Sequence, residues 1–418
     1  MSDVRFMVVS PPCIEPVNRA VYRVLAQQHG LAVKLVIPRR SFIGARWKEC
    51  PAVTGEPFET VLLEVEGKHP RLRQLQGLEQ LIQTWRPTHV LVDGDPGTRM
   101  TLQVTRAARA LGADRPQVWV LTAENLLPTY RWDFLTALKQ GRPTPAVGAL
   151  ITWWLRSAVA PKVDHVFTLS RDGTRVMEAQ GFVGRATQIP LGFDPALFHP
   201  QSPEKIAATR ARLGLRSRTV AYFGRLMPEK GLHLLLAALE PLKDLSWQLL
   251  LDRFSDYDNP EYTAKLKEQL AARGLNERLV FFDAKHAEMP DYMNAADVVV
   301  LPSISTPKWK EQYGRVLPEA MACGKIVVGS DSGAIPELIG EGGLIFPEGN
   351  VAALSATLRG LMQAKEAELA SMRERAQQRA DTLTIFKQAE IWANLATGQN
   401  TIRQMSERKQ MAENSQNS

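Results

Sequence analysis

Short apolar runs alternate with amphipathic segments along the first half of the chain. The runs "VRFMVV", "AVKLVIP", "VLVDG", "QVWVLT" and "HVFTLS" lack strict alternation, which is typical of strands buried on both faces. Apolar positions recur at helical spacing in residues 17–30, 99–112 and 171–182. Because strands and helices alternate, the pattern predicts a parallel sheet covered by helices, and hence a doubly wound α/β domain over residues 1–190.

A second series of the same kind follows a break in the pattern. Residues 191–204 are rich in proline and lack periodicity, so they are predicted to be a linker. The strand and helix patterns then resume and predict a second doubly wound domain over residues 205–382, ending in one long helix from about residue 351. Residues 383–398 predict a final helix, and the polar residues 399–418 predict a disordered tail.

Length and composition limit the class of protein. A chain of 418 residues with 44% hydrophobic residues is too long for one ordinary core. No apolar run reaches about 18 residues, and the first residues do not have the layout of a signal peptide, so a cytoplasmic protein is predicted. Cys13, Cys50 and Cys323 are far apart, and the seven histidines have no ligand spacing, so neither a disulfide framework nor a metal site is predicted.

The net charge of +7 is unevenly distributed. Residues 101–162 contain eight Lys or Arg and three Asp or Glu, which favours an anionic partner: a nucleotide, a lipid headgroup or nucleic acid. A solvated basic face is the alternative, and nucleic acid ranks last because no interleaved aromatic and basic stripe is present. Residues 146–162, with adjacent Trp153 and Trp154, are predicted to form either a core helix, the preferred interpretation, or a helix that contacts a membrane surface and presents a lipid-linked acceptor.

Two open sheets in one chain are expected to bind ligands in a cleft between the carboxyl ends of their strands. In "AYFGRLMPEKG", Gly224 follows a predicted strand, and Arg225 and Lys230 flank the start of a helix near Gly231. A helix N-terminus with two cations is suited to an anion, and the spacing allows both cations to reach one diphosphate. The alternative is two surface cations beside a loop.

Two acids occur in "KEQYGRVLPEAMACGK". Glu311 is predicted to lie in a loop, and Glu319 about one turn into the following helix. Carboxylates accept hydrogen bonds from vicinal hydroxyls such as those of sugars and ribose. Alternatively, Glu319 only favours the helix N-terminus electrostatically. Gly314 and, in "SDSGAIPE", Gly333 permit close approach, so nearby backbone N–H groups are candidate contacts as well.

These motifs resemble a known family. "FGRLMPEKG", "ADVVVLPS", "EQYGRVLPEAMACGKIVVGSDSGAIPELI" and "GGLIFPEGN" look like the nucleotide-sugar-binding half of glycosyltransferase family 4, a family of group 1 glycosyltransferases, and "IPLGFDPALF" resembles its interdomain linker. The match spans roughly residues 185–350, whereas the first half matches only in architecture. The resemblance implies a GT-B fold, with two Rossmann-like domains facing a central cleft and residues 383–398 crossing back to the first domain.

The resemblance also implies an activity: retaining, metal-independent transfer of a hexose from a UDP- or GDP-linked donor to a glycan, lipid-linked or small-molecule acceptor, as in polysaccharide biosynthesis. Arg225 and Lys230 would hold the diphosphate and stabilise it as a leaving group. Glu319 would accept hydrogen bonds from the ribose, and Glu311 would contact the transferred sugar. No cofactor is implied. The implied donor-binding residues are Gly224, Arg225, Lys230, Tyr313, Gly314, Arg315, Val316 and Glu319.

The sequence departs from the family's pattern in three places. The loop "SPPCIEPVNRA" replaces a Gly-Gly loop, and no histidine follows "VWVLT", where Glu124 or Asn125 is predicted either to contact the acceptor or to cap the next turn. Asp252 and Arg253 replace a glycine-rich turn, and Arg253 either contacts phosphate or stays on the surface. These departures motivate a second hypothesis, a catalytically inactive nucleotide-sugar-binding protein. A nicotinamide-dependent oxidoreductase is disfavoured because no Gly-x-Gly-x-x-Gly follows a predicted strand.

Overall fold

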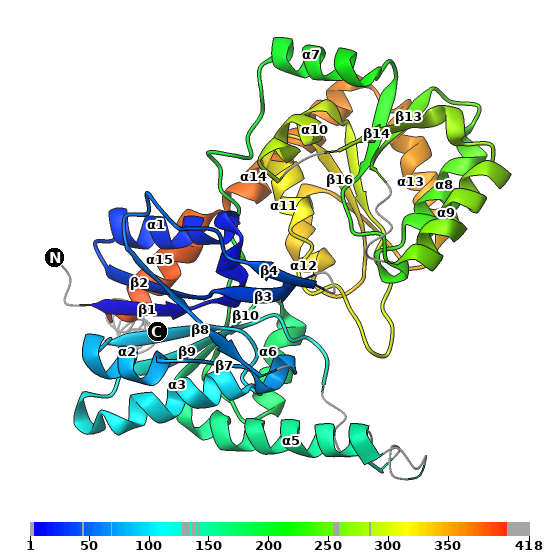
Figure 1. The fold of residues 1–418 in the computed structure, drawn as a ribbon. Coiled ribbons are helices and arrows are strands. Elements are labelled where there is room, and N and C mark those ends of the chain that lie inside the picture. The colour runs from blue at the N-terminus through cyan, green and yellow to red at the C-terminus, as the bar shows by residue number, and fades with distance from the viewer. Residues whose placement is uncertain are drawn as a thin grey trace, which may run out of the picture. The chain divides into compact units, whose positions relative to one another are not determined.

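The chain folds into two compact α/β units. A computed structural model describes residues 4–398 apart from residues 44–45, 68, 128–133, 136–138, 140–142, 254–258 and 284–285. The first unit comprises residues 1–190 and 385–418, and the second comprises residues 191–384. Each unit is built on one large parallel sheet (Figure 1). The predicted disordered tail lies outside the described residues.

The sheet of the first unit has seven strands in the order β11-β10-β9-β8-β1-β2-β5, and every neighbouring pair is parallel. The chain adds strands on one side of β1 and then returns to add β8 and its successors on the other side. The strand order therefore reverses between β1 and β8, where open α/β sheets bind ligands. The strands are β1 (Arg5–Val9), β2 (Ala32–Pro38), β5 (Glu59–Leu63), β8 (His89–Asp93), β9 (Gln117–Thr122), β10 (His165–Thr168) and β11 (Ala186–Gln188).

Helices cover both faces of this sheet. On one face the apolar sides of α2 (Leu78–Trp85), α3 (Arg99–Ala110) and α5 (Pro143–Val159) pack into a shared core (Figure 1). On the other face α1 (Ala20–Gln27) lies against α15 (Ile385–Ala396), and Tyr22 stacks on Trp392 with 5.9 Å between ring centroids. The final helix therefore completes the core of the first unit. The unit also contains α6 (Arg171–Ala179) and the hairpins β3 (Arg40–Ile43) with β4 (Arg46–Glu49) and β6 (Val65–Glu66) with β7 (Gln74–Leu75).

The sheet of the second unit has six strands in the order β14-β13-β12-β15-β16-β17, again all parallel. Its central runs, such as "VVVL" of β15, are buried throughout, as expected for strands covered on both faces. Here the strand order reverses between β12 and β15. The strands are β12 (Arg218–Tyr222), β13 (Trp247–Asp252), β14 (Leu279–Phe282), β15 (Val298–Leu301), β16 (Ile326–Ser330) and β17 (Leu344–Phe346).

The helices of the second unit also form two layers (Figure 1). One apolar cluster joins α8 (Leu232–Leu239), α9 (Pro260–Ala272) and α13 (Val351–Gln363) to the sheet. The prediction of one long helix from about residue 351 to 382 is wrong, because α13 ends at Gln363 and α14 begins at Glu366 after extended backbone at Lys365. Residues 203–204, predicted to be linker, begin α7. The other helices are α7 (Pro203–Leu213), α10 (Met289–Ala295), α11 (Val316–Ala322), α12 (Ile335–Ile339) and α14 (Glu366–Asp381).

Candidate functional site

The predicted cations and acids of the second unit lie on the loops at its strand reversal. Strands β12 and β15 are neighbours, with Val220 paired to Val298. The loop with Arg225 and Lys230 follows β12, and the loop with Glu311 follows β15. Because the strands are parallel, both loops leave the same edge of the sheet. Residues far apart in the sequence therefore meet where open α/β sheets bind ligands.

The loop after β12 is fixed by a tyrosine at its base. The buried hydroxyl of Tyr222 donates a hydrogen bond to the carbonyl oxygen of Arg225 at 2.9 Å and lies 3.4 Å from that of Lys230. Gly224 is placed so that an added Cβ would lie 2.6 Å from the same hydroxyl. The tyrosine thus sets the path of the segment that carries both cations.

The two loops pack directly on one another. Gly231 has φ +72°, and a Cβ at this position would lie 1.8 Å from the carbonyl oxygen of Pro302. Nearby, the backbone N–H of Ile304 donates to the carbonyl oxygen of Glu229 at 2.8 Å. Only glycine satisfies both the positive φ and the close approach, so Gly231 allows the loops to touch.

Lys230 and Glu311 form an ion pair within this packing. The ammonium nitrogen of Lys230 lies 2.6 Å from Oε2 of Glu311, and the two side chains are only 15% and 5% exposed. The hydroxyl of Ser303 donates to the same oxygen at 2.8 Å, and the ammonium lies 5.2 Å from the ring centroid of Trp309. The sequence did not predict roles for Ser303 and Trp309. Ser303 lies two residues after the buried strand β15, and a serine in that position of a ligand-side loop could have been recognised as a candidate.

The backbone of Glu311 explains why position 333 is a glycine. The sequence had predicted that Gly333 permits the close approach of a ligand to nearby backbone N–H groups. Gly333 has φ +55°, and a Cβ there would lie 2.1 Å from the carbonyl oxygen of Glu311. The next N–H, that of Ala334, donates to this oxygen at 3.0 Å. Gly333 and Ala334 therefore contact the backbone of Glu311 and hold its loop in place.

Glu319 lies in the first turn of α11, as predicted, and is buried. Burial raises the pKa of Glu319 to about 8, and the nearby charge of Arg315 opposes this rise. Gly314, with φ +82°, makes the turn before the helix, where an added Cβ would meet the side chain of Leu301 at 2.9 Å. Tyr313 is buried and Val316 begins α11, so these predicted donor-binding residues share one short segment.

Arg225 differs from Lys230 in its exposure. Its side chain is exposed to solvent, and no hydrogen bond or ion pair of its guanidinium is seen among the described residues. The loops therefore carry one solvent-accessible cation, Arg225, and one ion pair, Lys230–Glu311, whose opposite charges compensate each other. Arg253, at the end of the neighbouring strand β13, is also exposed, and burial raises the pKa of adjacent Asp252.

The acceptor-side candidates lie at the carboxyl end of β9 in the first unit. Glu124 forms an ion pair with Arg156 of α5, and the two side chains are 15% and 8% exposed. Asn125 is buried. The pair joins the end of β9 to α5, so at least part of the role of Glu124 is structural. Its contact with an acceptor stays a prediction.

The proline-rich loop after β1 is held firmly. Residues 11–14 and 16–19 form two short 3₁₀ helices, and the buried Arg19 donates to the carbonyl oxygens of Cys13 and Ile14 at 2.8 and 3.2 Å. The hydroxyl of Ser10 donates to Asp93 of β8 at 2.7 Å. This segment is therefore structured by its own side chains rather than by glycine.

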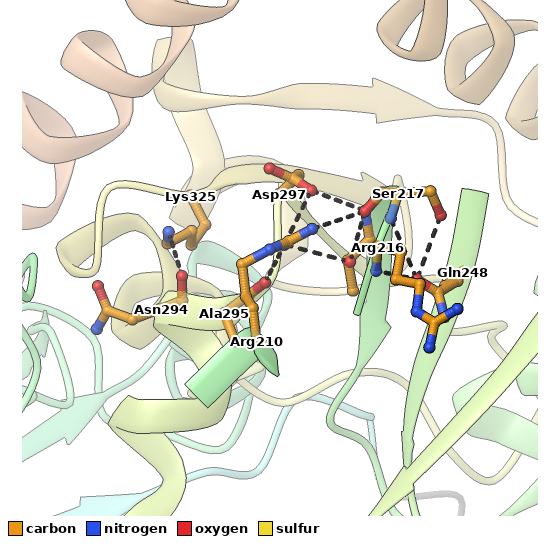
Figure 2. Close-up of polar contacts among 9 residues, drawn as sticks. Arg210, Arg216, Ser217, Gln248, Asn294, Ala295, Asp297 and Lys325 are labelled. Carbon is orange, nitrogen blue, oxygen red and sulfur yellow. Dashed lines mark hydrogen bonds and ion pairs between the residues drawn. The ribbon is translucent and has the colours of Figure 1, made fainter. Parts of the chain in front are cut away.

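A second polar network lies at the opposite edge of the second sheet (Figure 2). Arg210 donates to the carbonyl oxygens of Ala295 and Ser217 at 2.6 and 2.7 Å and pairs with Asp297 at 3.5 Å. Lys325 donates to the carbonyl oxygen of Asn294 at 2.7 Å, and burial lowers its pKa to about 8. These groups satisfy backbone carbonyls before the strands begin, so we interpret this network as structural.

One helix of the first unit combines a buried and an exposed apolar face. Leu155 and Val159 of α5 are buried, whereas Val147, Leu150, Trp153 and Trp154 are 53%, 47%, 56% and 51% exposed. The preferred interpretation as a core helix therefore holds for one face only. No helix in the described part of the chain is long and apolar enough to cross a bilayer. Within the same residues, no cluster of His, Cys, Asp and Glu is placed to hold a metal ion.

Comparison with known proteins matches the segment that carries this geometry. Residues 206–380 match the family described as glycosyl transferases group 1. The match covers most of the second unit. The chain is 30% identical over 193 residues to the D-inositol 3-phosphate glycosyltransferase of Corynebacterium efficiens, a match that covers 44% of each protein. It is 31% identical over 156 residues to the lipopolysaccharide core biosynthesis mannosyltransferase LpsB of Rhizobium meliloti, covering 37% of this chain and 42% of LpsB. The matches thus span less than half the length of these relatives.

Solved structures extend the likeness to the whole fold. HepE of Anabaena, in complex with UDP, has a TM-score of 0.65 at 18% identity, and the match covers 97% of this chain and all of HepE. A glycosyltransferase from Rickettsia africae has a TM-score of 0.68 at 15% identity, covering 95% of this chain and 99% of that protein. At such identities the likeness concerns the fold alone. It confirms the predicted GT-B class of two parallel α/β units, and membership of family 4 stays a prediction.

Proposed function

We propose that the protein is a glycosyltransferase that moves a hexose from a nucleoside diphosphate sugar to a hydroxyl group of an acceptor. The observation that carries the proposal is that Arg225 and the Lys230–Glu311 ion pair lie on loops at the strand reversal of a unit that matches the group 1 glycosyl transferases over residues 206–380. HepE, which shares the fold, has been solved with UDP-glucose as well as with UDP. These complexes support a UDP-linked donor, and the resemblance to family 4 leaves a GDP-linked donor as the alternative.

Each residue is proposed to have a separate role. The exposed Arg225 binds the diphosphate, and Lys230 adds positive charge as the leaving group forms. Lys230 is positioned by Glu311, whose carboxylate also accepts a hydrogen bond from Ser303. Glu311 accepts a hydrogen bond from the transferred sugar, because a carboxylate can accept several hydrogen bonds. Glu319 binds the ribose hydroxyls. Retention of anomeric configuration and independence from divalent metal are further parts of the proposal, and they follow from the resemblance to family 4.

The experiment uses the purified full-length chain, several nucleoside diphosphate sugars and a chelator. Thermal shift measures donor binding, because a ligand bound to the folded state raises the unfolding temperature, and release of the nucleoside diphosphate measures turnover. Arg225→Gln should reduce donor affinity roughly 10- to 100-fold, as expected for the loss of charge-assisted contacts. Arg216→Gln is the matched control, an exposed arginine at the opposite edge of the same sheet. Equal donor affinity in both variants would contradict the site.

The same experiment distinguishes the proposed enzyme from a second candidate function. An inactive nucleotide-sugar-binding protein is favoured by Thr122 to Asn125, which replace the expected histidine, and by the ion pair of Glu124 with Arg156. Such a protein would show the thermal shift without turnover across an acceptor panel. Turnover that is lost with Lys230→Ala would exclude it.

We further propose that α5 contacts the surface of a membrane with anionic headgroups. Val147, Leu150 and Trp154 recur at helical spacing on its exposed face, and Trp153 lies beside them. At the end of the helix, burial and the charges of Arg109 and Arg106 lower the pKa of Lys162, so three cations gather there. An apolar stripe beside cations suits a helix that lies in the headgroup region.

A further inference from the structure

The first unit has a cavity at its own strand reversal. It measures about 240 Å³ and is lined by residues that follow or end three neighbouring strands: Pro11 after β1, Pro38 of β2 and Asp93 of β8. Open α/β sheets bind ligands at this position. The volume is slightly below the range of roughly 300–1,000 Å³ typical of sites for drug-sized ligands, which suits a group the size of a single sugar ring.

Much of the cavity wall is rigid and apolar. Pro11, Pro38 and Pro70 have fixed φ angles, and Val65, Leu75 and Met100 complete the apolar part. Pro11 lies in the loop that Arg19 holds through two backbone carbonyls. The cavity is therefore formed before any ligand binds, so little conformational entropy is lost on binding.

The charged groups in the wall are mainly positive. Arg40 and Arg73 both line the cavity, and Asp93 is the only acid among the described residues that line it. The guanidinium carbons of Arg40 and Arg73 lie 4.9 and 4.7 Å from the ring centroid of Trp47. One indole thus orients two guanidinium groups, which would otherwise repel one another, beside the same cavity. A guanidinium group matches the geometry of phosphate oxygens, and two of them line this cavity.

The remaining polar groups are suited to hydroxyls. Ser41, Gln74 and Thr98 line the cavity with Asp93, whose Oδ2 accepts a hydrogen bond from Ser10 at 2.7 Å. Hydroxyl and amide groups of this kind hydrogen-bond sugars and cyclitols. The wall therefore combines two groups for an anion with several for a polyol.

We propose that this cavity binds the acceptor and that the acceptor is a polyol bearing a phosphate group, with the phosphate on Arg40 and Arg73. The proposal rests on the proposed glycosyltransferase function and names its acceptor class. The phosphate belongs either to a free sugar or cyclitol phosphate or to a lipid headgroup, and both present the same chemistry to the two arginines.

The test measures binding without a donor, so that it does not depend on turnover. Calorimetry with the full-length chain uses glucose 6-phosphate, inositol 1-phosphate and their unphosphorylated forms, and flotation uses vesicles of phosphatidylcholine with or without phosphatidylinositol. The cavity predicts binding of at least one phosphorylated probe and roughly 10- to 100-fold weaker binding of its unphosphorylated form. Arg73→Gln and Arg40→Gln should each weaken the phosphorylated probe by a similar factor.

Arg39→Gln is the matched control. Arg39 precedes Arg40, is 55% exposed and pairs with Glu64 rather than lining the cavity. Binding of the soluble phosphates identifies a free acceptor, and arginine-dependent binding of phosphatidylinositol vesicles alone identifies a lipid source. Failure of every phosphorylated probe to bind, or equal loss in Arg39→Gln and Arg73→Gln, would overturn the proposal. Thermal unfolding of each variant shows that it is folded. Failure of donor binding would contradict the proposed function without changing these results.

Discussion

The ammonium nitrogen of Lys230 lies 2.6 Å from Oε2 of Glu311, a residue 81 positions later in the chain. The two side chains therefore act as one unit that joins the loop after β12 to the loop after β15. This pairing changes the interpretation of both residues, because each side chain helps to position the other independently of a donor.

Lys230→Ala should lower the free energy of unfolding by about 3–5 kcal/mol, because it leaves the buried Glu311 carboxylate without its cation. Urea unfolding measures this loss. The double variant Lys230→Ala/Glu311→Ala should lose less than the sum of the two single variants, since no unpaired charge remains. Arg225→Gln should change stability by less than about 0.5 kcal/mol, because its side chain is exposed. Additive losses in the double variant would contradict a coupled pair.

The alternation of buried strands and helices was sufficient to predict the two parallel sheets. The strand β15 is a continuous apolar run and β16 begins with one, a pattern that is expected where both faces of a sheet are covered. The pattern did not predict strands that are too short to show a period, nor a helix end that carries no glycine or proline. The hairpins β3–β4 and β6–β7 are too brief for periodicity, and the break between α13 and α14 at Lys365 contains neither glycine nor proline.

The sequence predicted the motif residues of the site but not the contacts between them. Motif residues such as Lys230 and Glu319 follow local spacing, whereas the Lys230–Glu311 contact and the cavity between Arg40 and Arg73 depend on strand order. Strand order is set by long-range packing that no local pattern records. The burial of Glu319 is similarly invisible in the sequence, because an acid in a first helical turn is usually explained by the helix dipole alone.

Glu319 should make stability depend on pH. Burial raises its pKa to about 8 in the folded state, from an ordinary value of 4.5. Between these values the folded state holds a proton that the unfolded state has lost, so the free energy of unfolding falls as pH rises, by about 1.4 kcal/mol per pH unit from this group. The contribution is fully present below about pH 4.5 and is lost once pH exceeds about 8. Urea unfolding at several pH values, with Glu319→Gln as the comparison, measures it. A constant difference between the two proteins from pH 5 to 8 would contradict the raised pKa.

Gly333→Ala should destabilise the protein by more than the cost of placing alanine at a positive φ angle, because the added methyl group also displaces the Glu311 loop. The new Cβ would lie 2.1 Å from the carbonyl oxygen of Glu311, so the loop must move. Gly349→Ala is the matched control, because Gly349 also has positive φ, +74°, but no atom lies within 4 Å of its added Cβ. The control should cost about 1 kcal/mol, and Gly333→Ala should cost more and also weaken nucleotide binding. Equal thermal shifts with UDP in the two variants would show that the loop tolerates the methyl group.

The exposed face of α5 predicts binding to anionic vesicles. About half of each indole of Trp153 and Trp154 is exposed, so inserting one removes roughly 100 Å² of apolar surface from water, worth about 2 kcal/mol. Trp153→Ser/Trp154→Ser should therefore weaken binding to phosphatidylglycerol vesicles by roughly tenfold or more in flotation. Val183→Ser, which changes a residue 74% exposed elsewhere in the first unit, should have little effect. Added salt should weaken binding of the unmodified chain, because Arg106, Arg109 and Lys162 supply the electrostatic part. If the tryptophan variant and the valine control bind these vesicles equally, α5 does not contact the membrane.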